Sequence, residues 1–392
     1  MKKVGITAVL LVGILVIGIF YSHSKKANLP TYFNYNPKKL NLLNKSYSKL
    51  VITAADLHKW DEVMFALVKS NKFGDAPASR IYAYVYTAQR DAAFLSYNMK
   101  HDFMGSLDPV SAAVLCQFFP NDCSKIKLQS KVDLYSEQLA ALVLVQIKQR
   151  MELDKTQEKL SPELRGDNYW VGVRPFYGQE VGSWKPWLIS STKKLLAPNP
   201  PKPGEKIWQN QLKQVETALL NITPNQTKEV VFWAGNPSTI TPPGIWLKFA
   251  DEFMSKEKIP LQKVLYVRSV LAMGIADSII VVFYSKYSYW VQRPFMLNPN
   301  LHTIMPTPNH PSYPAGHSTI SATAATILSY YFPQNKMNWW QKADEASSSR
   351  VWGGIHFPLD ATEGLTLGKR VGNTVINIQK PLNPDKKNEY SL

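Results

Sequence analysis

Residues 272–293 read Ala-Met-Gly-Ile-Ala-Asp-Ser-Ile-Ile-Val-Val-Phe-Tyr-Ser-Lys-Tyr-Ser-Tyr-Trp-Val-Gln-Arg, and this stretch decides the fold. Its first half is apolar nearly all round, so a helix formed here must be buried on every side. Proline is favourable in a first helical turn, which predicts a helix that starts near Pro260 and runs towards Arg293. Arg268 and Asp277 lie within it and argue against a membrane span. We therefore expect a central core helix.

Helical spacing of apolar residues recurs on both sides of this core helix. It is found at 77–94, 132–151, 245–256, 318–332 and 338–350. Strand-like alternation is scarce and no internal repeat is present. The sequence therefore predicts an all-α helical bundle.

Proline-rich segments divide the chain. The run Ala197-Pro-Asn-Pro-Pro-Lys-Pro-Gly204 suits neither a helix nor a central strand and marks the best internal break. A second such turn, Thr241-Pro-Pro-Gly244, is expected before the helix at 245–256. The predicted organisation is a signal or anchor at 1–26, an N-terminal helical region at 27–200, a catalytic region at 201–378 and a tail at 379–392.

Composition points to a folded protein with anionic partners. The 392 residues are 45% apolar and 12% aromatic, which is enough for a substantial core. The formal net charge of +16 favours phosphorylated substrates, membrane surfaces or nucleic acid, or serves solubility alone. Zinc-finger spacing and long Lys/Arg runs are missing from the sequence, so we expect no nucleic-acid partner.

The N-terminus resembles an export signal. Lys2 and Lys3 precede an uncharged apolar stretch from Val4 to Phe20, and small polar residues follow, with a cleavage point available after Ser24. The stretch is also near the lower length limit of a spanning helix, so an uncleaved anchor is the alternative. In both cases we expect the remainder to leave the cytoplasm, periplasmic or secreted, with membrane contact only through this segment.

The two cysteines, Cys116 and Cys123, suit an exported protein because their spacing permits a short disulfide loop. Two free or buried thiols are the equal alternative, since geometry and not spacing decides pairing.

The first segment that carries chemistry is Lys286-Tyr-Ser-Tyr-Trp-Val-Gln-Arg293-Pro294. Lys286 and Arg293 are two helical turns apart, which would return both cations to one helix face, with Pro294 ending the helix. A solvated basic face is the plain alternative. Because the preceding residues are almost wholly apolar, we expect instead that the cations serve a buried anion.

The second segment is Pro308-Asn-His310-Pro-Ser-Tyr-Pro314-Ala315-Gly316-His317-Ser318-Thr319. A proline-rich loop leads into a glycine and then a helix of small residues. Glycine permits close approach of a ligand, and free N–H groups at a helix N-terminus attract anions. His317 is placed to act as an acid or base there.

The third segment is Ser349-Arg350-Val-Trp-Gly-Gly-Ile-His356-Phe-Pro-Leu-Asp360. Four-residue spacing would bring His356 and Asp360 together on a helix. The carboxylate can then hold one imidazole nitrogen and leave the other free to attack phosphorus or bind a metal oxyanion. Arg350 adds a forked donor suited to tetrahedral oxyanions.

These three segments together resemble the signature of the superfamily that joins type 2 phosphatidic acid phosphatases, bacterial acid phosphatases and vanadium-dependent haloperoxidases. The resemblance implies that Lys286, Arg293, Arg350 and the Gly316 N–H bind phosphate or vanadate. It also implies that His317 is the acid/base, His356 the nucleophile or vanadium ligand, and Asp360 its orienting partner.

Upstream stretches, including Phe232-Trp-Ala-Gly235, resemble bacterial haloperoxidase-like proteins, and His310 lies where bromoperoxidases of this type carry a second histidine. His310, Ser349 and Phe283 are expected to support the site. Two departures weaken the resemblance to haloperoxidases. Ala315 replaces the serine before Gly-His, and Phe283 stands where a tryptophan is usual.

The sequence leaves three functions open. The first is an exported vanadium-haloperoxidase-like enzyme that holds vanadate and oxidises halide with peroxide. The second is an acid phosphatase that cleaves phosphate esters through a phosphohistidine and needs no cofactor. The third is a non-catalytic anion-binding envelope protein, which the complete set of site residues disfavours. All three imply a small anionic ligand.

Overall fold

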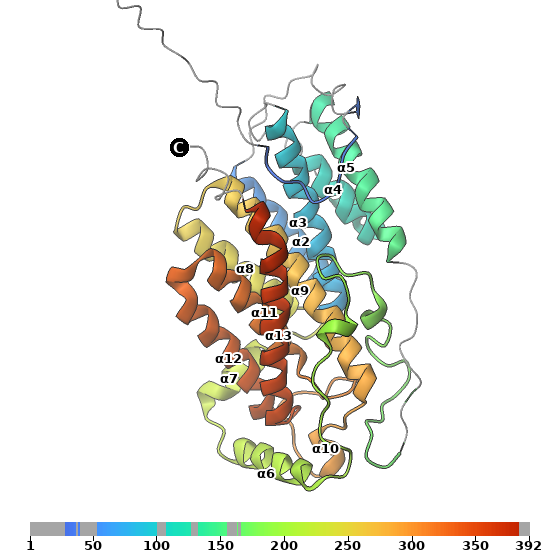
Figure 1. Cartoon of the computed structure of the whole chain (residues 1–392), viewed down its shortest axis with the longest axis vertical. Coiled ribbons are helices and arrows are strands. Elements are labelled where there is room, and N and C mark those ends of the chain that lie inside the picture. Colours follow the sequence, from blue (N-terminus) through green and yellow to red (C-terminus); the bar gives the residue numbers. More distant parts are fainter. Residues whose placement is uncertain are drawn as a thin grey trace, which may run out of the picture.

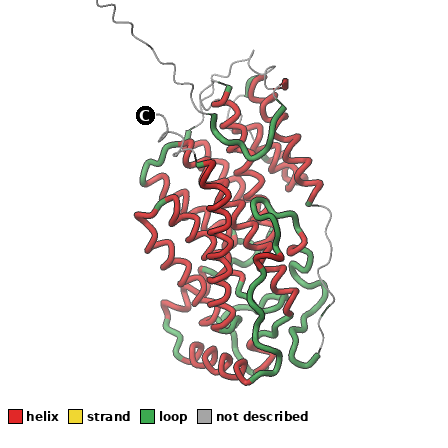
Figure 2. The backbone as a smooth tube through the Cα atoms, viewed as in Figure 1, coloured by secondary structure: helices red, strands yellow, loops and turns green. Residues whose placement is uncertain are grey.

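Helix α9 (Leu261–Tyr289) is the axis of an all-helical bundle in the computed structural model (Figures 1 and 2). The structure describes residues 28–36, 38–39, 53–99, 107–126, 132–154, 163 and 166–383. Every residue from Val264 to Phe283 is buried, which confirms the predicted core helix. Within the described part of the chain, α9 is the one helix long and apolar enough to cross a membrane, and its apolar window is fully buried inside the protein.

Among the other helices, four long ones pack directly against α9 and the remaining ones pack mainly on these four or on each other, and the described residues form only isolated β-bridges. In chain order they are α2 (Ala54–Ser70), α3 (Asp75–Asn98), α4 (Leu107–Phe118), η1 (Pro120–Lys125), α5 (Leu134–Leu153), η2 (Val181–Ser183), η3 (Lys193–Leu195), α6 (Lys206–Leu220), α7 (Pro224–Phe232), α8 (Thr241–Lys256), α10 (Pro294–Leu297), α11 (Gly316–Tyr331), η4 (Pro333–Asn335), α12 (Lys336–Trp352), α13 (Pro358–Gln379) and η5 (Lys380–Leu382).

The predicted helices are all present, with two differences at their ends. The segment 241–244, which we expected to be a turn before the helix, is the first turn of α8. Backbone N–H groups in a first helical turn have no partner within the helix, so proline, which has no N–H, is accepted there. The core helix ends at Tyr289 and not near Arg293, because Trp290 adopts a left-handed conformation with φ 50°. The run at 197–204 forms a loop as expected, while the domain boundary proposed there stays a prediction.

Close packing of α11 on α13 places two helix N-termini side by side. Gly364, Gly368 and Gly372 of α13 face α11, and a Cβ at Gly368 would lie 2.2 Å from the Thr319 carbonyl oxygen. Side chains at these positions would therefore force the helices apart. The Ala315 N–H also donates to the Asp360 carbonyl at 2.9 Å. The second and third sequence segments are joined in this way.

The N-terminal lead-in is bound to α3 where the structure describes it. The Asp91 carboxylate accepts hydrogen bonds from the N–H groups of Tyr32 and Phe33 and from the Tyr35 hydroxyl. The Arg90 guanidinium donates to the Pro30 carbonyl. Residues 1–26, where we predict a signal or anchor, lie outside the described residues.

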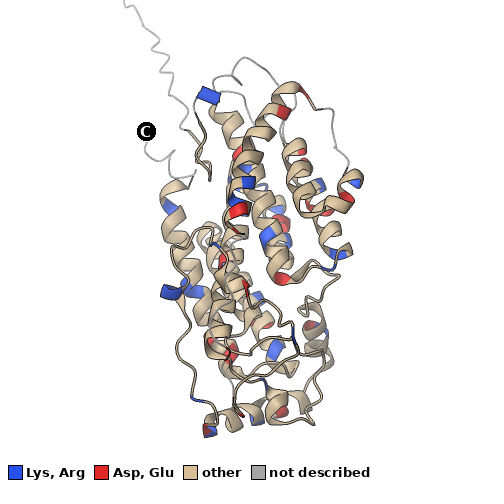
Figure 3. Cartoon of the chain, turned by 90° about the vertical axis from the view of Figure 1, so that its right-hand side faces the viewer, with Lys and Arg blue, Asp and Glu red and all other residues tan. Residues whose placement is uncertain are grey.

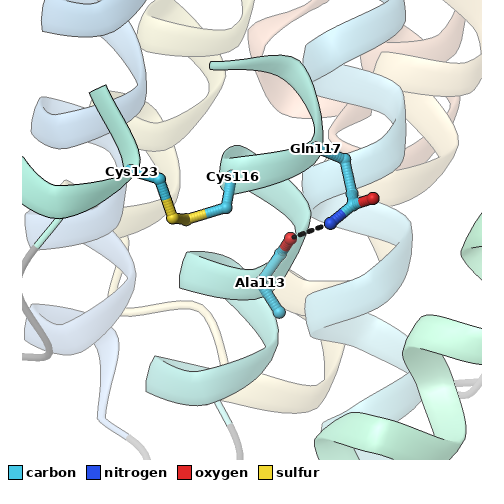
Figure 4. The surroundings of a disulfide bond; sticks show 4 residues. All are labelled: Ala113, Cys116, Gln117 and Cys123. Atoms are coloured by element: carbon cyan, nitrogen blue, oxygen red, sulfur yellow. Dashed lines mark hydrogen bonds between the residues drawn. A yellow bond between two sulfur atoms is a disulfide. The ribbon is translucent and has the colours of Figure 1, made fainter. Parts of the chain in front are cut away.

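Cys116 and Cys123 form a disulfide between the end of α4 and η1, with their Cα atoms 4.9 Å apart (Figure 4). Of the two alternatives that the sequence left open, the structure has the paired one.

Acidic and basic residues are interspersed along the helices (Figure 3). Several buried charges outside the signature segments are paired. Arg268 contacts both Asp61 and Asp251, and Arg150 contacts Asp154 at 2.6 Å. Such pairing is the usual condition for burying a charge.

Candidate active site

The three sequence segments converge on a cavity of about 310 Å³. Of the residues expected in the site, six line it: Phe283, Lys286, His310, Gly316, His317 and His356. Four others, Arg293, Ser349, Arg350 and Asp360, are fully buried in the protein and are not part of the cavity lining. The structure therefore brings the predicted residues together in two groups: six line the cavity, and four are buried in the protein around it.

Lys286 lines the cavity and Arg293 lies buried against His310, in an arrangement that differs from the predicted one. They do not share a helix face, because α9 ends before Arg293. Lys286 Nζ donates to the carbonyls of Pro311 (2.9 Å) and Ser312 (2.6 Å). Arg293 donates to the carbonyls of His310 (2.9 Å) and Ile355 (2.6 Å). Both cations thus fasten the loop that leads to Gly316.

Arg350 approaches from the last turn of α12. Its Nη2 donates to the Val230 carbonyl at 2.7 Å, its Nη1 contacts Met305 Sδ, and its Nε donates to Ser349 Oγ at 3.0 Å. The role of Ser349 is therefore to hold the guanidinium in place.

The site cations lack the partners that other buried charges have. In the part of the chain that the structure describes, no carboxylate forms an ion pair with Lys286, Arg293 or Arg350. Burial lowers the pKa of Arg293 and of Arg350 to about 9. Burial also lowers the pKa of Lys286, and the neighbouring Arg293 charge adds to this effect. A bound anion would relieve this cost.

Each cation keeps hydrogen-bond donors for such an anion. A guanidinium has five N–H donors and an ammonium has three, so the contacts above leave some unused on all three side chains. Gly316 begins α11, where backbone N–H groups have no partner within the helix. A Cβ at Gly316 would meet nothing within 4 Å. The space beside this N-terminus is open, and the donor set fits a tetrahedral oxyanion such as phosphate or vanadate.

His356 and Asp360 contact each other although His356 is not on a helix. The helix α13 begins at Pro358, so His356 precedes it and Asp360 lies in its first turn. The Asp360 carboxylate accepts from the Phe357 N–H at 3.0 Å and from His356 Nδ1 at 3.1 Å. The first-turn carboxylate thus fastens the residues before the helix. With Nδ1 engaged, Nε2 is the ring nitrogen left for a ligand in the cavity.

His317 is held by the segment after α7. Its Nε2 lies 2.7 Å from the Trp233 carbonyl and must donate to it, which leaves Nδ1 as the acceptor nitrogen. Burial lowers the pKa of His317 well below its usual value, and the Arg350 charge lowers it further. Both effects favour the neutral imidazole.

His310 and Phe283 form one wall. Their rings are 5.3 Å apart, and His310 Nδ1 lies 3.1 Å from Arg293 Nη2. Burial lowers the pKa of His310, so it too is neutral. Ala315 is the N-cap of α11, has no side-chain cap bond and does not line the cavity.

Three residues of the site were not predicted. Ser312 donates its hydroxyl hydrogen to the Asp360 carboxylate. Asp75 and Tyr177 of the N-terminal half line the cavity and share a 2.6 Å hydrogen bond. Ser312 lies within the second quoted segment, so a polar residue beside Gly-His was available as a signal. No sequence pattern marks Asp75 or Tyr177 as a site residue, because only the fold brings them to the cavity.

Comparison with known proteins agrees with this site. Residues 265–384 match the PAP2 superfamily, and this stretch includes all three signature segments. Residues 265–384, about a third of the chain, thus form a PAP2 superfamily region. An undecaprenyl-diphosphatase of Sulfolobus acidocaldarius is 35% identical over 126 residues, which are 31% of this chain and 59% of that protein. The bacitracin transport permease protein BcrC of Bacillus licheniformis is 24% identical over 27% of this chain and 51% of that protein. The chain thus spans little more than half the length of these PAP2 relatives.

Solved structures share the fold over most of this chain. A bacterial vanadium-dependent iodoperoxidase superposes with a TM-score of 0.67 and 20% identity, over 85% of this chain and 98% of the other. A bacterial vanadium-dependent chloroperoxidase in its holo form gives 0.63 and 10% identity, over 80% and 94%. At these identities the likeness shows the fold, including the N-terminal helices. The individual residue roles stay predictions.

Proposed function

We propose that this protein is an exported, vanadium-haloperoxidase-like enzyme that oxidises halide with hydrogen peroxide. The observation that carries the proposal is the set of buried cations near His356, Lys286, Arg293 and Arg350, which form no ion pair with a carboxylate in the described part of the chain and so suit a bound vanadate. His317 donates its Nε2 hydrogen to the Trp233 carbonyl and keeps Nδ1 for proton exchange with peroxide. The fold shared with two vanadium-dependent peroxidases over at least 80% of this chain supports the proposal.

The residues present fit vanadate. His356 Nε2 would ligate the metal, and Lys286, Arg293, Arg350 and the Gly316 N–H would bind its oxygens. Bound vanadate would supply the peroxide-activating centre. The chain's own contribution is to neutralise the oxyanion, to hold His356 in one orientation through Asp360, and to take up a proton at His317.

The second candidate is a phosphatase, favoured by Ala315 and by the 35% identical undecaprenyl-diphosphatase. Without a serine hydroxyl at position 315 the site has one donor fewer. A hydrogen bond to a charged group contributes about 1.5–3 kcal/mol. A permanently held oxyanion loses more from this than a phosphate that turns over. In this reaction His356 attacks phosphorus as the ester P–O bond breaks and the alcohol leaves, and water then hydrolyses the phosphohistidine to release phosphate.

Parallel assays on the purified protein test these functions. One measures iodide and bromide oxidation with vanadate and peroxide, and the other measures p-nitrophenyl phosphate hydrolysis without vanadate. We expect vanadate-dependent halide oxidation that His356→Ala abolishes and that His302→Ala, a change at an exposed histidine outside the cavity, leaves intact.

Two outcomes would contradict the leading proposal. Hydrolysis with a trapped phosphohistidine at His356 and no halide oxidation would establish the phosphatase. Vanadate binding without either activity would establish the non-catalytic anion-binding protein.

A further inference from the structure

A carboxylate stands in the wall of a cavity that is otherwise built for anions. Asp75 is the first residue of α3 and lines the same cavity as Lys286, His317 and His356. Its Oδ1 accepts from the Tyr177 hydroxyl at 2.6 Å and from the Ala76 N–H at 2.8 Å. In the described part of the chain, no other residue donates a hydrogen bond to its Oδ2. One carboxylate oxygen is therefore left for a ligand.

The position of this carboxylate is strongly fixed. A Cβ at Gly74 would lie 2.3 Å from the Tyr177 hydroxyl oxygen, so glycine is needed for Tyr177 to reach Asp75. The Tyr177 N–H donates to the Asn309 carbonyl at 3.0 Å, and the Tyr177 carbonyl accepts from the Tyr287 hydroxyl at 2.6 Å. Four segments far apart in the chain thus cooperate to hold one hydrogen bond at the cavity wall.

The surroundings oppose part of the cost of burying this carboxylate. Burial raises the pKa of Asp75 above its usual value, and the Tyr177 hydroxyl, the Ala76 N–H and the Lys286 charge limit that rise. The N-terminus of the 24-residue helix α3 adds a favourable dipole. A negative charge at this wall attracts cations and hydrogen-bond donors and repels a second anionic group.

We propose that Asp75 is the specificity-determining residue of a subsite beside the oxyanion site, and that this subsite takes an organic group bearing an ammonium or hydroxyl donor. The proposal rests on the oxyanion site of the proposed function, and it holds for either reaction. The group is the organic acceptor if the enzyme halogenates, and the leaving group if it hydrolyses phosphate esters. Ligands with a second anionic group, such as diphosphates, are disfavoured.

The remaining lining is consistent with a small organic group. Beyond Asp75, Lys286 and the histidines, the lining includes the apolar side chains of Phe283, Met305, Pro242, Pro306 and Pro308. The polar residues Asn236, Thr307 and Asn309 also line it and carry no charge. A ligand would therefore place its oxyanion among the cations, its carbon atoms against the apolar wall and its donor at Asp75 Oδ2.

Matched phosphate esters test the subsite by equilibrium binding, without any turnover. Phosphoethanolamine and phosphoglycolate have two-carbon tails that end in an ammonium and a carboxylate, and 3-aminopropyl phosphate extends the reach by one carbon. Their affinities are measured by calorimetry at pH 8, in competition with orthovanadate. Binding of free ethanolamine is also measured with the vanadate-loaded protein. Binding in this experiment would show that the subsite accepts an organic ligand that is not joined to the oxyanion as an ester.

We expect the wild-type protein to prefer the ammonium ligands by roughly tenfold or more, as one nearby charge of opposite sign allows. Asp75→Asn should reduce this ratio at least about fivefold. Tyr177→Phe breaks the same hydrogen bond but keeps the charge, so it should retain the preference. Asp167→Asn removes one exposed negative charge outside the cavity and should not change the ratio.

The outcomes separate the two proposals. If inorganic phosphate and vanadate fail to bind, the oxyanion site itself is wrong. If they bind but the ratio is the same in the wild-type protein and in Asp75→Asn, the Asp75 subsite is wrong and the oxyanion site stands. If Tyr177→Phe loses the preference as fully as Asp75→Asn, the pair has a structural role and the charge does not determine specificity.

Discussion

The Ser312 hydroxyl donates to Asp360 Oδ2, the same oxygen that receives the Nδ1–H of His356. Ser312 is also fixed through its backbone. Its N–H donates to the Val291 carbonyl at 2.9 Å, and its carbonyl accepts from Lys286 Nζ at 2.6 Å. One residue therefore links the cation, the carboxylate and the histidine of the site.

This link predicts the acid side of the pH profile. Burial raises the pKa of Asp360 to about 6, and the Ser312 hydrogen bond opposes that rise. Activity should fall as the pH drops through about 6, because a protonated Asp360 no longer fixes the His356 tautomer. Ser312→Ala should move this midpoint up by roughly one to two pH units, since a hydrogen bond to a charge is lost.

The same shift has a definite sign for stability. The folded-state pKa of Asp360 lies above its unfolded value of about 3.9, so its contribution to stability declines as the pH rises from about 4 to 6.

The pH–activity profile of Ser312→Ala is compared with that of a control variant, Ser321→Ala. This control loses a buried hydroxyl that is bonded to Trp246 and lies away from His356 and Asp360. A uniform loss of activity at all pH values would contradict this role of Ser312.

Arg350→Ala should weaken vanadate binding by about a hundredfold or more. The guanidinium is buried without a carboxylate partner, and losing a charged contact in such a site costs about 2–5 kcal/mol. Arg350→Lys should recover only part of the affinity, because it keeps the positive charge but loses the planar set of guanidinium N–H donors. Vanadate titration of these variants is compared with Arg174→Ala, an exposed control. Unchanged affinity in Arg350→Ala would remove Arg350 from the site.

Ala315→Ser should stabilise the protein and lengthen vanadate retention. Ala315 is the N-cap of α11 without a side-chain cap, and a serine oxygen can accept a first-turn N–H, which contributes about 1 kcal/mol. Its hydrogen is then available to an oxyanion. Thermal unfolding and vanadate dissociation rates measure the two effects. Bromide oxidation should rise and phosphatase turnover should fall. A variant that melts higher but releases vanadate no more slowly would show that the hydroxyl does not reach the ligand.

Adding Phe283→Trp brings a second donor near the oxyanion at a cost in packing. A Cβ at Gly178 would lie 2.4 Å from Phe283 Cε1, so the 177–178 loop leaves little room for a larger ring. We expect the double variant to retain vanadate longest but to lose about 1–3 kcal/mol of stability to overpacking. Vanadate retention equal to that of Ala315→Ser alone would show that the indole makes no contact.

Export is tested by fusing residues 1–30 to a reporter that is active only outside the cytoplasm. The basic residues Lys2 and Lys3 and the apolar stretch to Phe20 predict a signal, and the Cys116–Cys123 disulfide suits an oxidising compartment. The substitution Leu15→Arg, within the apolar stretch, should abolish the signal from the reporter. A fusion that stays inactive without this change would overturn the localisation.

The amino-acid sequence alone predicted six of the helices, including the central one, and the side chains of the candidate site. The apolar run at 272–284 could only be a buried helix, and three short segments carried the cations and histidines in order. These features depend on residue type and on spacing of at most about a dozen positions. Local physical chemistry is sufficient at that range.

Only the tertiary structure decided how these residues meet. Lys286 and Arg293 do not share a helix, and His356 precedes the helix that carries Asp360, because a left-handed Trp290 and the start of α13 at Pro358 redirect the chain. Asp75 and Tyr177 are 102 residues apart and touch because Gly74 permits close approach of the Tyr177 ring. No local pattern encodes such a contact, since its energy depends on packing between segments that are distant in the chain.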